Sequence, residues 1–556
     1  MASDSPDDKS AAQNVERTSS GSMDSPSMSL DQLRVLNLVR AGHNVFFTGN
    51  AGSGKTFLLE RIVADLKKRF PIPDEFRRRV AVTATTGIAA THIGGQTLNA
   101  ALGLSIVNTY EDFKSMRSPQ STKRIKELEV IIIDECSMLS GEMLEALEVQ
   151  LREIRGNNSS RDGKKKAVTA AGGVQLVFAG DFYQLPPISR PVSASTPPSA
   201  FVNFGYAFMA PAWTRCDFRT VVLRHVFRQK DQTLVDALNA IREGPESKRA
   251  RNALRRIVKA CLRPLHEFEQ KTGIIPTQIF SRNDDVNRMN DVEMKRLLEE
   301  RMEPEHVMLA RDDVVLENPF GPDAARRKDQ LRQSEFFRDC AAQPRFSLCR
   351  GAQVMLLRNL DTSAGRVNGS RGVVVDFLSK EAVLADVLRG SHDIARASPY
   401  VEVANIAAWS GSRLPVVRFT DGAQLVVTPT RFTAQMNGGE CARLQVPLKL
   451  AWAITVHKSQ GMSLDAAKLS LRSMFAVGQA YVALSRVRST EGLQVLDWDM
   501  GCLRTDPDVR RFYDEHQKDD SIPSDEKDTE KRQHPAWEAY TRSRCVLCPL
   551  PKNRVI

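Results

Sequence analysis

The chain of 556 residues is 42% hydrophobic and 26% charged, which are ordinary values for a soluble globular protein. No run approaches the ~18 consecutive apolar residues of a transmembrane helix, which excludes an integral membrane role. Nine cysteines, most of them isolated, argue against a disulfide scaffold and for a reducing compartment.

Charge is distributed unevenly along the chain. Residues 1–31 and 506–533 each carry a net −4 and residues 534–556 carry +3, so the formal net charge of +11 leaves +16 on residues 32–505. A basic body between acidic segments is typical of a protein that binds a polyanion. A solvated basic surface would give the same composition, and charge alone does not separate the two interpretations.

The first residues show no sign of a folded element. Residues 1–28 are rich in Ser, Asp and Met and have no hydrophobic period, which predicts a disordered acidic tail. They contain no apolar signal core, and their acidic residues are atypical of a transit peptide. Ser29-Leu30-Asp31-Gln32 is typical of a helix cap and predicts a helix that continues to Arg40.

Short apolar segments then alternate with helical ones. This alternation predicts α/β domains built on doubly wound parallel sheets with flanking helices. A second alternating region extends over about 229–499. The expected elements are strands at Asn44–Thr48, Arg79–Thr83, Val130–Ile133 and Val174–Ala179 with a helix at Lys55–Lys68, and in the second region strands at Ile275–Phe280 and Leu450–Thr455.

The pattern changes between about Val373 and Leu444, where short apolar runs are broken by Gly, Pro and Ser. Such runs predict a small β-barrel inserted in the second domain. Residues 157–173 and 191–199 are predicted to be surface loops, and the end from Pro507 a charged segment with one short helix. The strands expected in the barrel include Val373–Phe377, Val401–Val403, Val416–Phe419 and Gln424–Val427.

The segment 49–56 fits the P-loop pattern G-x-x-x-x-G-K-[ST] and lies between an expected strand and an expected helix. Backbone N–H groups and the helix dipole of such a loop bind phosphates, and Gly52 and Gly54 permit its tight turn. Lys55 would face the β- and γ-phosphates of ATP, and Thr56 would bind Mg²⁺. The predicted ATP-binding residues of this loop are Gly49, Asn50, Ala51, Gly52, Ser53, Gly54, Lys55 and Thr56.

Two further motifs follow expected strands. After Val130–Ile133 come Asp134, which would lie beside the metal, and Glu135, which would polarise the attacking water. Phe178–Pro187 contains Asp181 and Gln184, and Gln184 is expected to sense the γ-phosphate or to orient the water.

These motifs together resemble those of the Pif-one-like helicases, a RecD-related branch of the superfamily-one helicases. Further matches follow in the order of that family. Residues 80–90 resemble its single-strand-binding loop, Val226-Phe227-Arg228-Gln229 its fourth motif, residues 451–461 its fifth and residues 481–486 its sixth. The resemblance extends over about 30–499.

The resemblance implies two RecA-like P-loop domains and a small inserted SH3-like β-barrel. The expected boundaries are a disordered acidic tail at 1–28, RecA-like domain 1 at 29–222, RecA-like domain 2 at 223–372 and 445–505, the barrel at 373–444 and a charged C-terminal tail at 506–556.

The resemblance also implies that ATP and Mg²⁺ are held between the two RecA-like domains. Arg228 and Arg486 would reach across from the second domain as arginine fingers. Gln32 would bind the adenine edge, and Thr56 and Asp134 would hold the metal. The expected catalytic residues are Lys55, Asp134, Glu135, Gln184, Arg228 and Arg486.

DNA contact is expected on the opposite face of that cleft. The family usually has Pro where Thr85 stands and His where Asn99 stands, and both departures lie on the expected DNA side. The residues that the resemblance assigns to DNA are Thr83, Thr86, His457, Lys458, Gln460, Gln479, Tyr481, Arg488 and Trp498.

The remaining motifs are weaker. Cys545 and Cys548 form a C-x₂-C without a second pair at zinc spacing, which favours a tail with reduced thiols over a metal site. The basic clusters Lys164–Lys166 and Lys248–Arg251 would serve nuclear import or DNA affinity, or are solvated surface.

By the resemblance, the chain is expected to be an ATP-dependent 5′–3′ DNA helicase. It would act as a monomer on single-stranded and forked DNA, with no membrane partner, in replication, recombination, repair and telomere control. The alternatives are a translocase that displaces proteins with little unwinding, and an ATP-gated nucleic-acid-binding protein. Residence in the nucleus is expected, with the mitochondrion as the alternative.

Overall fold

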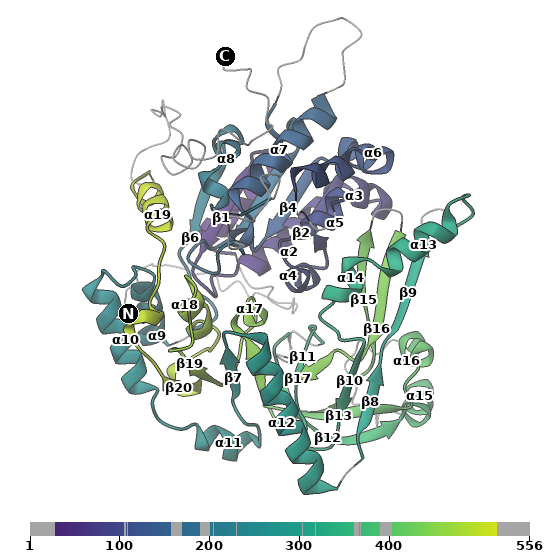
Figure 1. The fold of residues 1–556 in the computed structure, drawn as a ribbon, viewed down its shortest axis with the longest axis vertical. Helices are drawn as coiled ribbons and strands as arrows, with labels where there is room; N and C mark the ends of the chain where they lie inside the picture. The colour runs from purple at the N-terminus through teal and green to yellow at the C-terminus, as the bar shows by residue number, and fades with distance from the viewer. Residues whose placement is uncertain are drawn as a thin grey trace, which may run out of the picture.

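The computed structural model shows two parallel sheets covered by helices and a third, antiparallel part at the lower right of Figure 1. This architecture confirms the predicted α/β class. The predictions for residues 1–27, for most of the loops 157–173 and 191–199, for Lys164–Lys166 and for Cys545 and Cys548 lie outside the described residues. The structure describes residues 28–104, 107, 109–156, 169–188, 201–203, 205–229, 231–302, 304–316, 319–360, 366, 368–389, 403–436 and 439–519.

The first α/β region is built on a six-stranded parallel sheet. Its strands, in spatial order, are β3 (Gln96–Thr97), β2 (Val80–Ala84), β4 (Val130–Asp134), β5 (Gln175–Gly180), β1 (Val45–Gly49) and β6 (Arg219–Leu223). Its helices are α1 (Leu30–Arg40), α2 (Lys55–Arg69), α3 (Pro73–Arg79), α4 (Gly87–His92), α5 (Leu98–Leu102), α6 (Pro119–Glu127), α7 (Gly141–Gly156) and α8 (Pro211–Arg215).

Helices cover both faces of this sheet. Every residue of β1, β4 and β5 is buried, as expected for parallel strands between two helical layers. Within β1, Phe47 packs with α1 and α2, whereas Phe46 packs on the opposite face with α7 and α8. The predicted strands are confirmed to within one residue at most ends, and Ser29 forms the predicted cap of α1 as a capping box with Gln32.

The second α/β region is built on a four-stranded parallel sheet. Its strands, in spatial order, are β18 (Ala453–Thr455), β7 (Thr277–Phe280), β19 (Ala467–Ser470) and β20 (Leu493–Asp497). Its helices are α9 (Gln232–Ile241), α10 (Lys248–Ala260), α11 (His266–Thr272), α12 (Asn283–Arg301), α17 (Val456–Ser459) and α18 (Gln479–Leu484). The basic cluster Lys248–Arg251 lies in the first turn of α10, where Lys248 and Arg249 are exposed.

The antiparallel part is larger than the predicted barrel and is not closed among the described strands. Its sheets are β14-β13-β12-β11-β17, β15-β16-β9 and β10-β8. Because β9 pairs with β16, and β11 with β12 and β17, antiparallel pairing begins well before residue 373. The strands are β8 (His306–Leu309), β9 (Arg311–Leu316), β10 (Arg345–Leu348), β11 (Gln353–Leu356), β12 (Arg371–Ser379), β13 (Arg413–Phe419), β14 (Gln424–Val426), β15 (Thr430–Met436), β16 (Gly439–Gln445) and β17 (Leu448–Leu450).

Two local predictions differ from the structure. Val403, expected in a strand, begins α16 (Val403–Ala408), whose Ile406 is buried in the core of the antiparallel part. Leu450 ends β17, so the expected strand at 450–455 is shortened to β18. The other helices of this part are α13 (Ala324–Arg332), α14 (Glu335–Asp339) and α15 (Lys380–Arg389).

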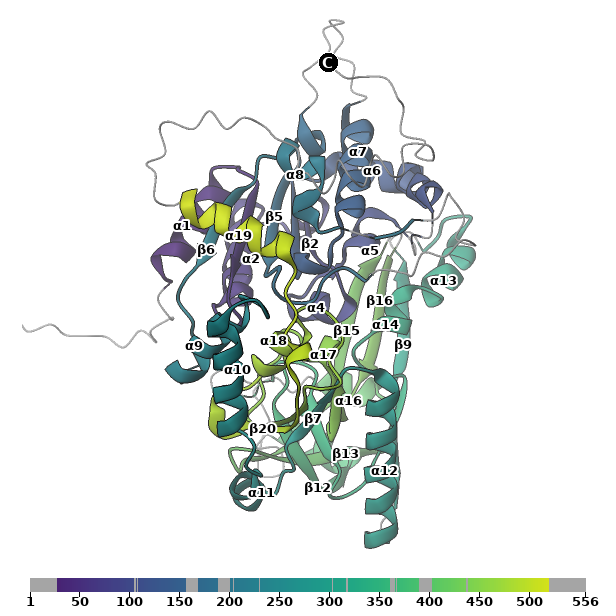
Figure 2. The same cartoon turned by 60° about the vertical axis from the view of Figure 1, so that its left-hand side comes forward.

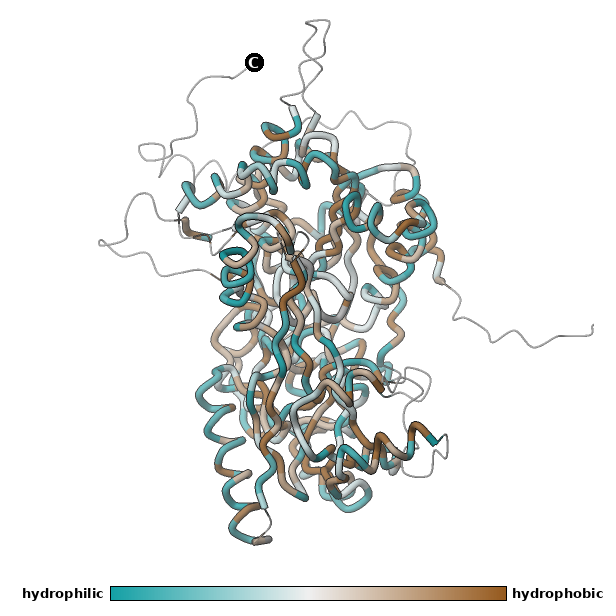
Figure 3. The backbone as a smooth tube through the Cα atoms, turned by 90° about the vertical axis from the view of Figure 1, so that its right-hand side faces the viewer, coloured by the Kyte–Doolittle hydropathy of each residue, from teal (hydrophilic) through white to brown (hydrophobic). Residues whose placement is uncertain are grey.

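The C-terminal helix α19 (Pro507–Asp519) follows the last strand of the second sheet but packs on the first α/β region. Val509, Phe512 and Tyr513 enter the core that contains Phe46 and Trp213. Figure 2 shows α19 lying across the first region, and in Figure 3 the hydrophobic segments gather in the strands at the centre of the molecule. The sequence predicted a short helix here but not this return to the first region.

Candidate functional site

The P-loop connects β1 to α2 as predicted. Gly52 and Gly54 have φ of +85° and +80°, a left-handed conformation that favours glycine. A Cβ on Gly52 would lie 2.5 Å from Cβ of Arg228, so only glycine lets the Val226–Gln229 segment pack on the loop. The backbone N–H of Phe227 donates to O of Gly52 at 2.8 Å. The loop is thus closed on one side by the segment that resembles the fourth helicase motif.

Lys55 lies inside this loop. Its Nζ donates to the backbone O of Gly49 at 2.8 Å and of Asn50 at 3.1 Å. Burial lowers the pKa of Lys55, and the carboxylates of Asp181 and Glu135 oppose that shift only in part. A phosphate in the loop would supply the anion that this ammonium lacks.

Asp134 and Glu135 stand at the carboxyl end of β4. Burial, followed by the neighbouring charge of Glu135, raises the pKa of Asp134 to about 7. Glu135 adopts φ of +51°, a rarely populated conformation that costs about 1–3 kcal/mol for a residue other than glycine. Burial also raises its pKa, although Lys55 and Arg486 counteract this. Two carboxyl groups are therefore held close together at reduced acidity, as at many catalytic sites.

A cavity of about 700 Å³ lies between the two α/β regions. The first region contributes the P-loop with Thr56, Glu135 and Gln184, and the second region contributes Arg228 and Arg486. The structure thus brings five of the six expected catalytic residues to one cavity. The sixth, Asp134, is buried and is not among the lining residues.

The two arginines carry positive charge into this cavity, and neither forms an ion pair with a carboxylate among the described residues. Burial and the nearby Arg486 lower the pKa of Arg228 to about 9. The guanidinium of Arg486 is buried and donates to the backbone O of Val482 and Ser459 and to Oγ of Ser485. Burial also lowers the pKa of Arg486. Three cations that are each destabilised by burial fit a polyanionic ligand such as a triphosphate.

The described residues fit ATP and Mg²⁺ in other respects. Nε2 of Gln32 and Oγ of Ser53 are buried beside the loop without a described hydrogen-bond partner. Gln32 Oε1 accepts from the N–H of Ser29, and its amide nitrogen can donate to a base. The hydroxyl of Thr56 and the carboxylate of Asp134 are the oxygen donors that Mg²⁺ prefers. No cluster of three metal-ligating side chains occurs in the described part of the chain.

A second cavity, a groove of about 770 Å³, separates the first α/β region from the antiparallel part. No acidic side chain is among its described lining residues. Three cations line it, Arg338, Lys449 and Lys458, together with hydroxyl and amide groups. Burial and the adjacent Lys458 lower the pKa of Lys449 to about 8. These are the donors that bind the phosphate oxygens of a nucleic-acid backbone.

The structure places two of the nine expected DNA residues in this groove. Thr86 and Lys458 line it, as do Thr85 and Asn99, the two departures from the family pattern. His457 is exposed beside Lys458, and partial desolvation of its ring by neighbouring residues lowers its pKa.

The other six expected DNA residues lie elsewhere, for reasons that the contacts make clear. Thr83 is buried and donates to the backbone O of Ile132, Gln460 donates to Glu135, and the buried Gln479 caps the loop before α18. Tyr481 faces the P-loop, because its hydroxyl accepts from the N–H of Ala51 at 3.1 Å. Arg488 lines the cavity between the two α/β regions and pairs with Asp465 at 3.5 Å. Trp498 packs on the core of the second region.

Sequence reasoning missed Lys449 and Arg338 in the groove and Phe57 and Phe227 in the first cavity. Phe57 directly follows the P-loop motif and Phe227 lies within the fourth motif, so their proximity to the loop could have been inferred from the residues beside them. Lys449 and Arg338 carry no such signal, because their place in the groove depends on how the antiparallel part packs against the first α/β region.

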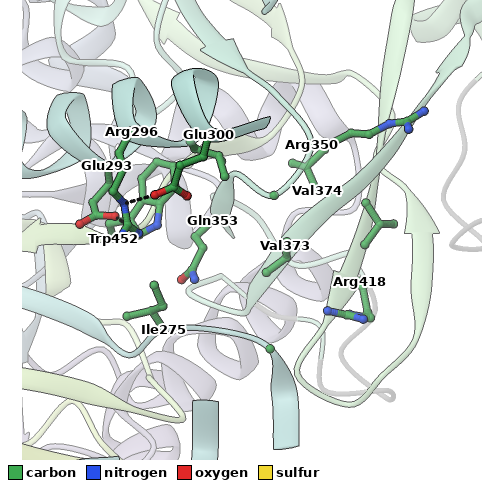
Figure 4. Close-up of a pocket in the computed structure, with 14 residues that line it drawn as sticks. Ile275, Glu293, Arg296, Glu300, Arg350, Gln353, Val373, Val374, Arg418 and Trp452 are labelled. Atoms are coloured by element: carbon green, nitrogen blue, oxygen red, sulfur yellow. Dashed lines mark ion pairs between the residues drawn. The ribbon is translucent and has the colours of Figure 1, made fainter. Parts of the chain in front are cut away.

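A third cavity, of about 520 Å³, lies between α12 and the antiparallel sheet and is drawn in Figure 4. On α12, Arg296 pairs with Glu293 at 2.7 Å and approaches Glu300 at 3.9 Å, and Arg418 faces them from β13. Its described lining holds three arginines and two glutamates, so it is less cationic than the other two cavities. Separately, no helix in the described ranges has the length and hydropathy that crossing a bilayer requires.

The chain matches two models of one family. Residues 27–249 match the model of the PIF1-like helicase, and residues 338–377 match that of the 2B domain of DNA helicase Pif1. Among curated relatives, ATP-dependent DNA helicase PIF1 of Xenopus laevis is 34% identical over 89% of this chain, and that of Homo sapiens 35% identical over 88%. This chain spans about 65% of the length of those relatives.

Other proteins match over more of their own length. Pif1 of a Psychrobacter strain is 32% identical over 89% of this chain and 71% of its own. The crystal structure of Pif1 helicase from Candida albicans is 31% identical with a TM-score of 0.61, over 88% of this chain and 99% of that one. A Bacteroides Pif1 in complex with ADP-AlF4, 24% identical with a TM-score of 0.61, covers 88% of this chain and 97% of its own and supports the fold. These matches agree with the P-loop, the two arginines from the second region and the groove described above. The chain belongs to the PIF1-like helicase family.

Proposed function

We propose that the chain is an ATP-dependent DNA helicase that translocates 5′ to 3′ on single-stranded DNA and unwinds duplexes. One observation carries the proposal. The segment Lys458–Ser463 lines both cavities, since Lys458 and Met462 face the groove while Gly461 and Ser463 face the first cavity. A change in how the two α/β regions meet around a nucleotide is therefore transmitted over a few residues to the groove.

The first cavity supports ATP hydrolysis. Glu135 would orient and deprotonate the attacking water, and Gln184 lines the same cavity. Lys55, Arg228 and Arg486 surround the space for the γ-phosphate with positive charge, which stabilises the negative charge of the transition state. Gln32 Nε2 would donate to the base, and Thr56 and Asp134 would hold Mg²⁺. The metal ion would neutralise phosphate charge when bound.

The groove supports binding of single-stranded DNA through its backbone. Thr86, Lys449 and Lys458 would contact phosphates, and such contacts are independent of base sequence. We propose that the protein works as a monomer on single-stranded and forked DNA, because both cavities are formed by one chain.

The alternatives are a translocase that displaces proteins and a nucleic-acid-binding protein that only responds to ATP. The discriminating experiment compares the full chain with Lys55→Ala on duplexes that carry a 5′ or a 3′ tail. The proposal predicts ATP-dependent unwinding of the 5′-tailed duplex alone, and none with Lys55→Ala. DNA-stimulated ATP hydrolysis without unwinding would favour the translocase, and absence of stimulated hydrolysis would favour the ATP-gated binder.

We further propose that the protein acts in nuclear genome maintenance, in replication, recombination, repair and telomere control. A basic body of +16 fits a nucleic-acid-rich compartment. Imaging a chain tagged at its carboxyl end leaves the amino-terminal residues free and tests this assignment. Nuclear signal is expected, and exclusive overlap with mitochondrial DNA would contradict it.

A further inference from the structure

A buried cluster of one arginine, one aspartate and three tyrosines lies behind the nucleotide cavity. We propose that Arg242 is a positioning residue that couples the second α/β region to the Asp181–Gln184 segment, and that Tyr513 of α19 holds this pair in place. The proposal rests on the ATP hydrolysis proposed above and adds residues that the family motifs do not contain.

The cluster is centred on an ion pair between the two α/β regions. Arg242, which follows α9, donates from a guanidinium nitrogen to Oδ1 of Asp181 at 2.8 Å. The Asp181 side chain is fully buried and that of Arg242 is 14% exposed. A buried pair that loses one partner leaves an uncompensated charge, so this contact is broken only at high cost.

Asp181 transmits this contact to the cavity wall. Its Oδ1 accepts from the N–H of Tyr183 at 3.2 Å, and its backbone O accepts from the N–H of Gln184 at 2.8 Å. Nε2 of Gln184 lies 3.5 Å from Oδ2 of Asp181. Because Gln184 lines the nucleotide cavity, the position of Asp181 sets where that amide faces the nucleotide.

Three tyrosine rings surround the guanidinium. Arg242 lies 4.4 Å from the ring centre of Tyr183, 5.6 Å from that of Tyr481 and 5.7 Å from that of Tyr513. Tyr183 and Tyr513 are stacked at 4.8 Å with an interplanar angle of 15°. Cation–π contacts of this kind are strongest where water is excluded, and the planar guanidinium suits them better than an ammonium does.

The tyrosine hydroxyls extend the cluster to the P-loop. Tyr481 donates to Oδ2 of Asp181 at 3.3 Å and accepts from the N–H of Ala51 at 3.1 Å. The hydroxyl of Tyr513 lies 2.7 Å from Oγ1 of Thr48, the residue before the loop, and accepts from the N–H of Phe182 at 3.1 Å. Single hydroxyl groups therefore connect the start of the phosphate loop with the Asp181–Gln184 segment.

The second region also contacts the Asp181–Gln184 segment directly. Gly478, at φ of +73° before α18, lies so close that a Cβ would be 2.4 Å from O of Gln184 and 2.7 Å from O of Tyr183. Movement of the second region must therefore move or release Asp181–Gln184. Tyr513 fixes the other side of the segment, since α19 is packed in the core of the first region. The cluster therefore links closure of the two regions to the position of Gln184.

The test uses the full chain with Arg242→Gln, Arg242→Lys and Tyr513→Phe, and Tyr206→Phe as the matched control. Tyr206 lies in the same core as Tyr513 and its hydroxyl contacts Asp506, but it does not touch Arg242 or Asp181 in the contacts described above. Steady-state ATP hydrolysis is measured with and without a saturating dT oligonucleotide. Affinity for a fluorescent ADP analogue and thermal stability are measured in parallel.

We expect Arg242→Gln to lower the DNA-stimulated kcat at least tenfold while KM for ATP and ADP affinity change less than threefold. Arg242→Lys should restore part of kcat, and Tyr513→Phe should lower kcat two- to fivefold. Tyr206→Phe should lower thermal stability about as much as Tyr513→Phe without changing kcat.

Wild-type kcat in Arg242→Gln below its melting temperature would overturn the proposal. If Arg242→Gln does not fold, Tyr513→Phe decides: equal kcat in Tyr513→Phe and Tyr206→Phe would overturn the proposal, and a selective loss in Tyr513→Phe would support it. Failure of the proposed function is distinguishable, because the wild-type chain itself would then show no DNA-stimulated hydrolysis.

Discussion

Gln460 donates a hydrogen bond from its Nε2 to Oε2 of Glu135 across 2.8 Å, although 325 positions separate them in the chain. Glu135 belongs to the first α/β region and lines the nucleotide cavity, and Gln460 follows α17 in the second. Two residues before Gln460, Lys458 lines the groove. The carboxylate proposed to orient water is thus held by a side chain that moves with the proposed DNA-binding segment.

We therefore expect Gln460→Ala to uncouple hydrolysis from DNA. A hydrogen bond to a charged group contributes about 1.5–3 kcal/mol, so DNA-stimulated kcat should fall about 10- to 100-fold. The bond also lowers the pKa of Glu135, so its loss should move the acid limb of the pH–rate profile to higher pH. Gln494→Ala, a half-buried glutamine of β20, is the control. An unchanged kcat and pH profile in Gln460→Ala would contradict the coupling.

Lys55→Ala should abolish ATP hydrolysis and unwinding while the fold survives. The ammonium is the cation that lies within the P-loop, and its loss should raise the barrier by several kcal/mol, which exceeds a hundredfold in rate. Lys68→Ala, an exposed lysine on the same helix α2, should behave like the wild type. Turnover above about a tenth of wild type in Lys55→Ala would show that the loop does not act as assigned.

The lowered pKa of Lys449 predicts that DNA affinity depends on pH. Its pKa in the free protein is about 8, lowered first by burial and then by the charge of Lys458. A bound phosphate raises that pKa, so binding takes up a proton above pH 8. Affinity should be constant below pH 8 and fall as pH rises through it, by at most about tenfold per unit.

Arginine stays protonated at these pH values, so Lys449→Arg should bind DNA with little change between pH 7 and 9. Lys458→Ala removes the repelling charge, which should move the onset of the loss to higher pH and reduce the salt slope of binding by about one. Fluorescence anisotropy with a labelled dT oligonucleotide measures both. Identical pH profiles for the wild type and Lys449→Arg would exclude Lys449 from the contact.

The sequence locates Lys55, Glu135 and Gln184 because each follows a strand within a few residues, and parallel strands deliver their carboxyl ends to one edge. It does not locate the groove residues equally well. Thr83, for example, is fully buried, and its hydroxyl donates to the backbone O of Ile132. Lys449 and Tyr513 depend on packing between segments far apart in sequence, and no local pattern encodes that packing.

The two arginines of the second region differ in their hydrogen bonds. This difference predicts that removing each side chain changes thermal stability by a different amount. Arg228 makes one long contact, from a guanidinium nitrogen to the backbone O of Gly461 at 3.4 Å. Arg486 is buried and makes three contacts within its own region. Arg228→Ala should therefore leave thermal stability nearly unchanged, whereas Arg486→Ala should lower it.

Both substitutions should slow hydrolysis by about three orders of magnitude, the lower end for an arginine finger. ATP and DNA affinities should stay nearly intact, because the phosphate loop belongs to the first region and the arginine charge acts mainly on the transferring γ-phosphoryl group. Arg472→Ala, an exposed arginine of the second region, is the control. Equilibrium binding of ATP, anisotropy with DNA and turnover are measured on each variant. If either substitution weakens nucleotide binding as much as turnover, the arginine acts in ground-state binding and the division of roles between the two regions is wrong.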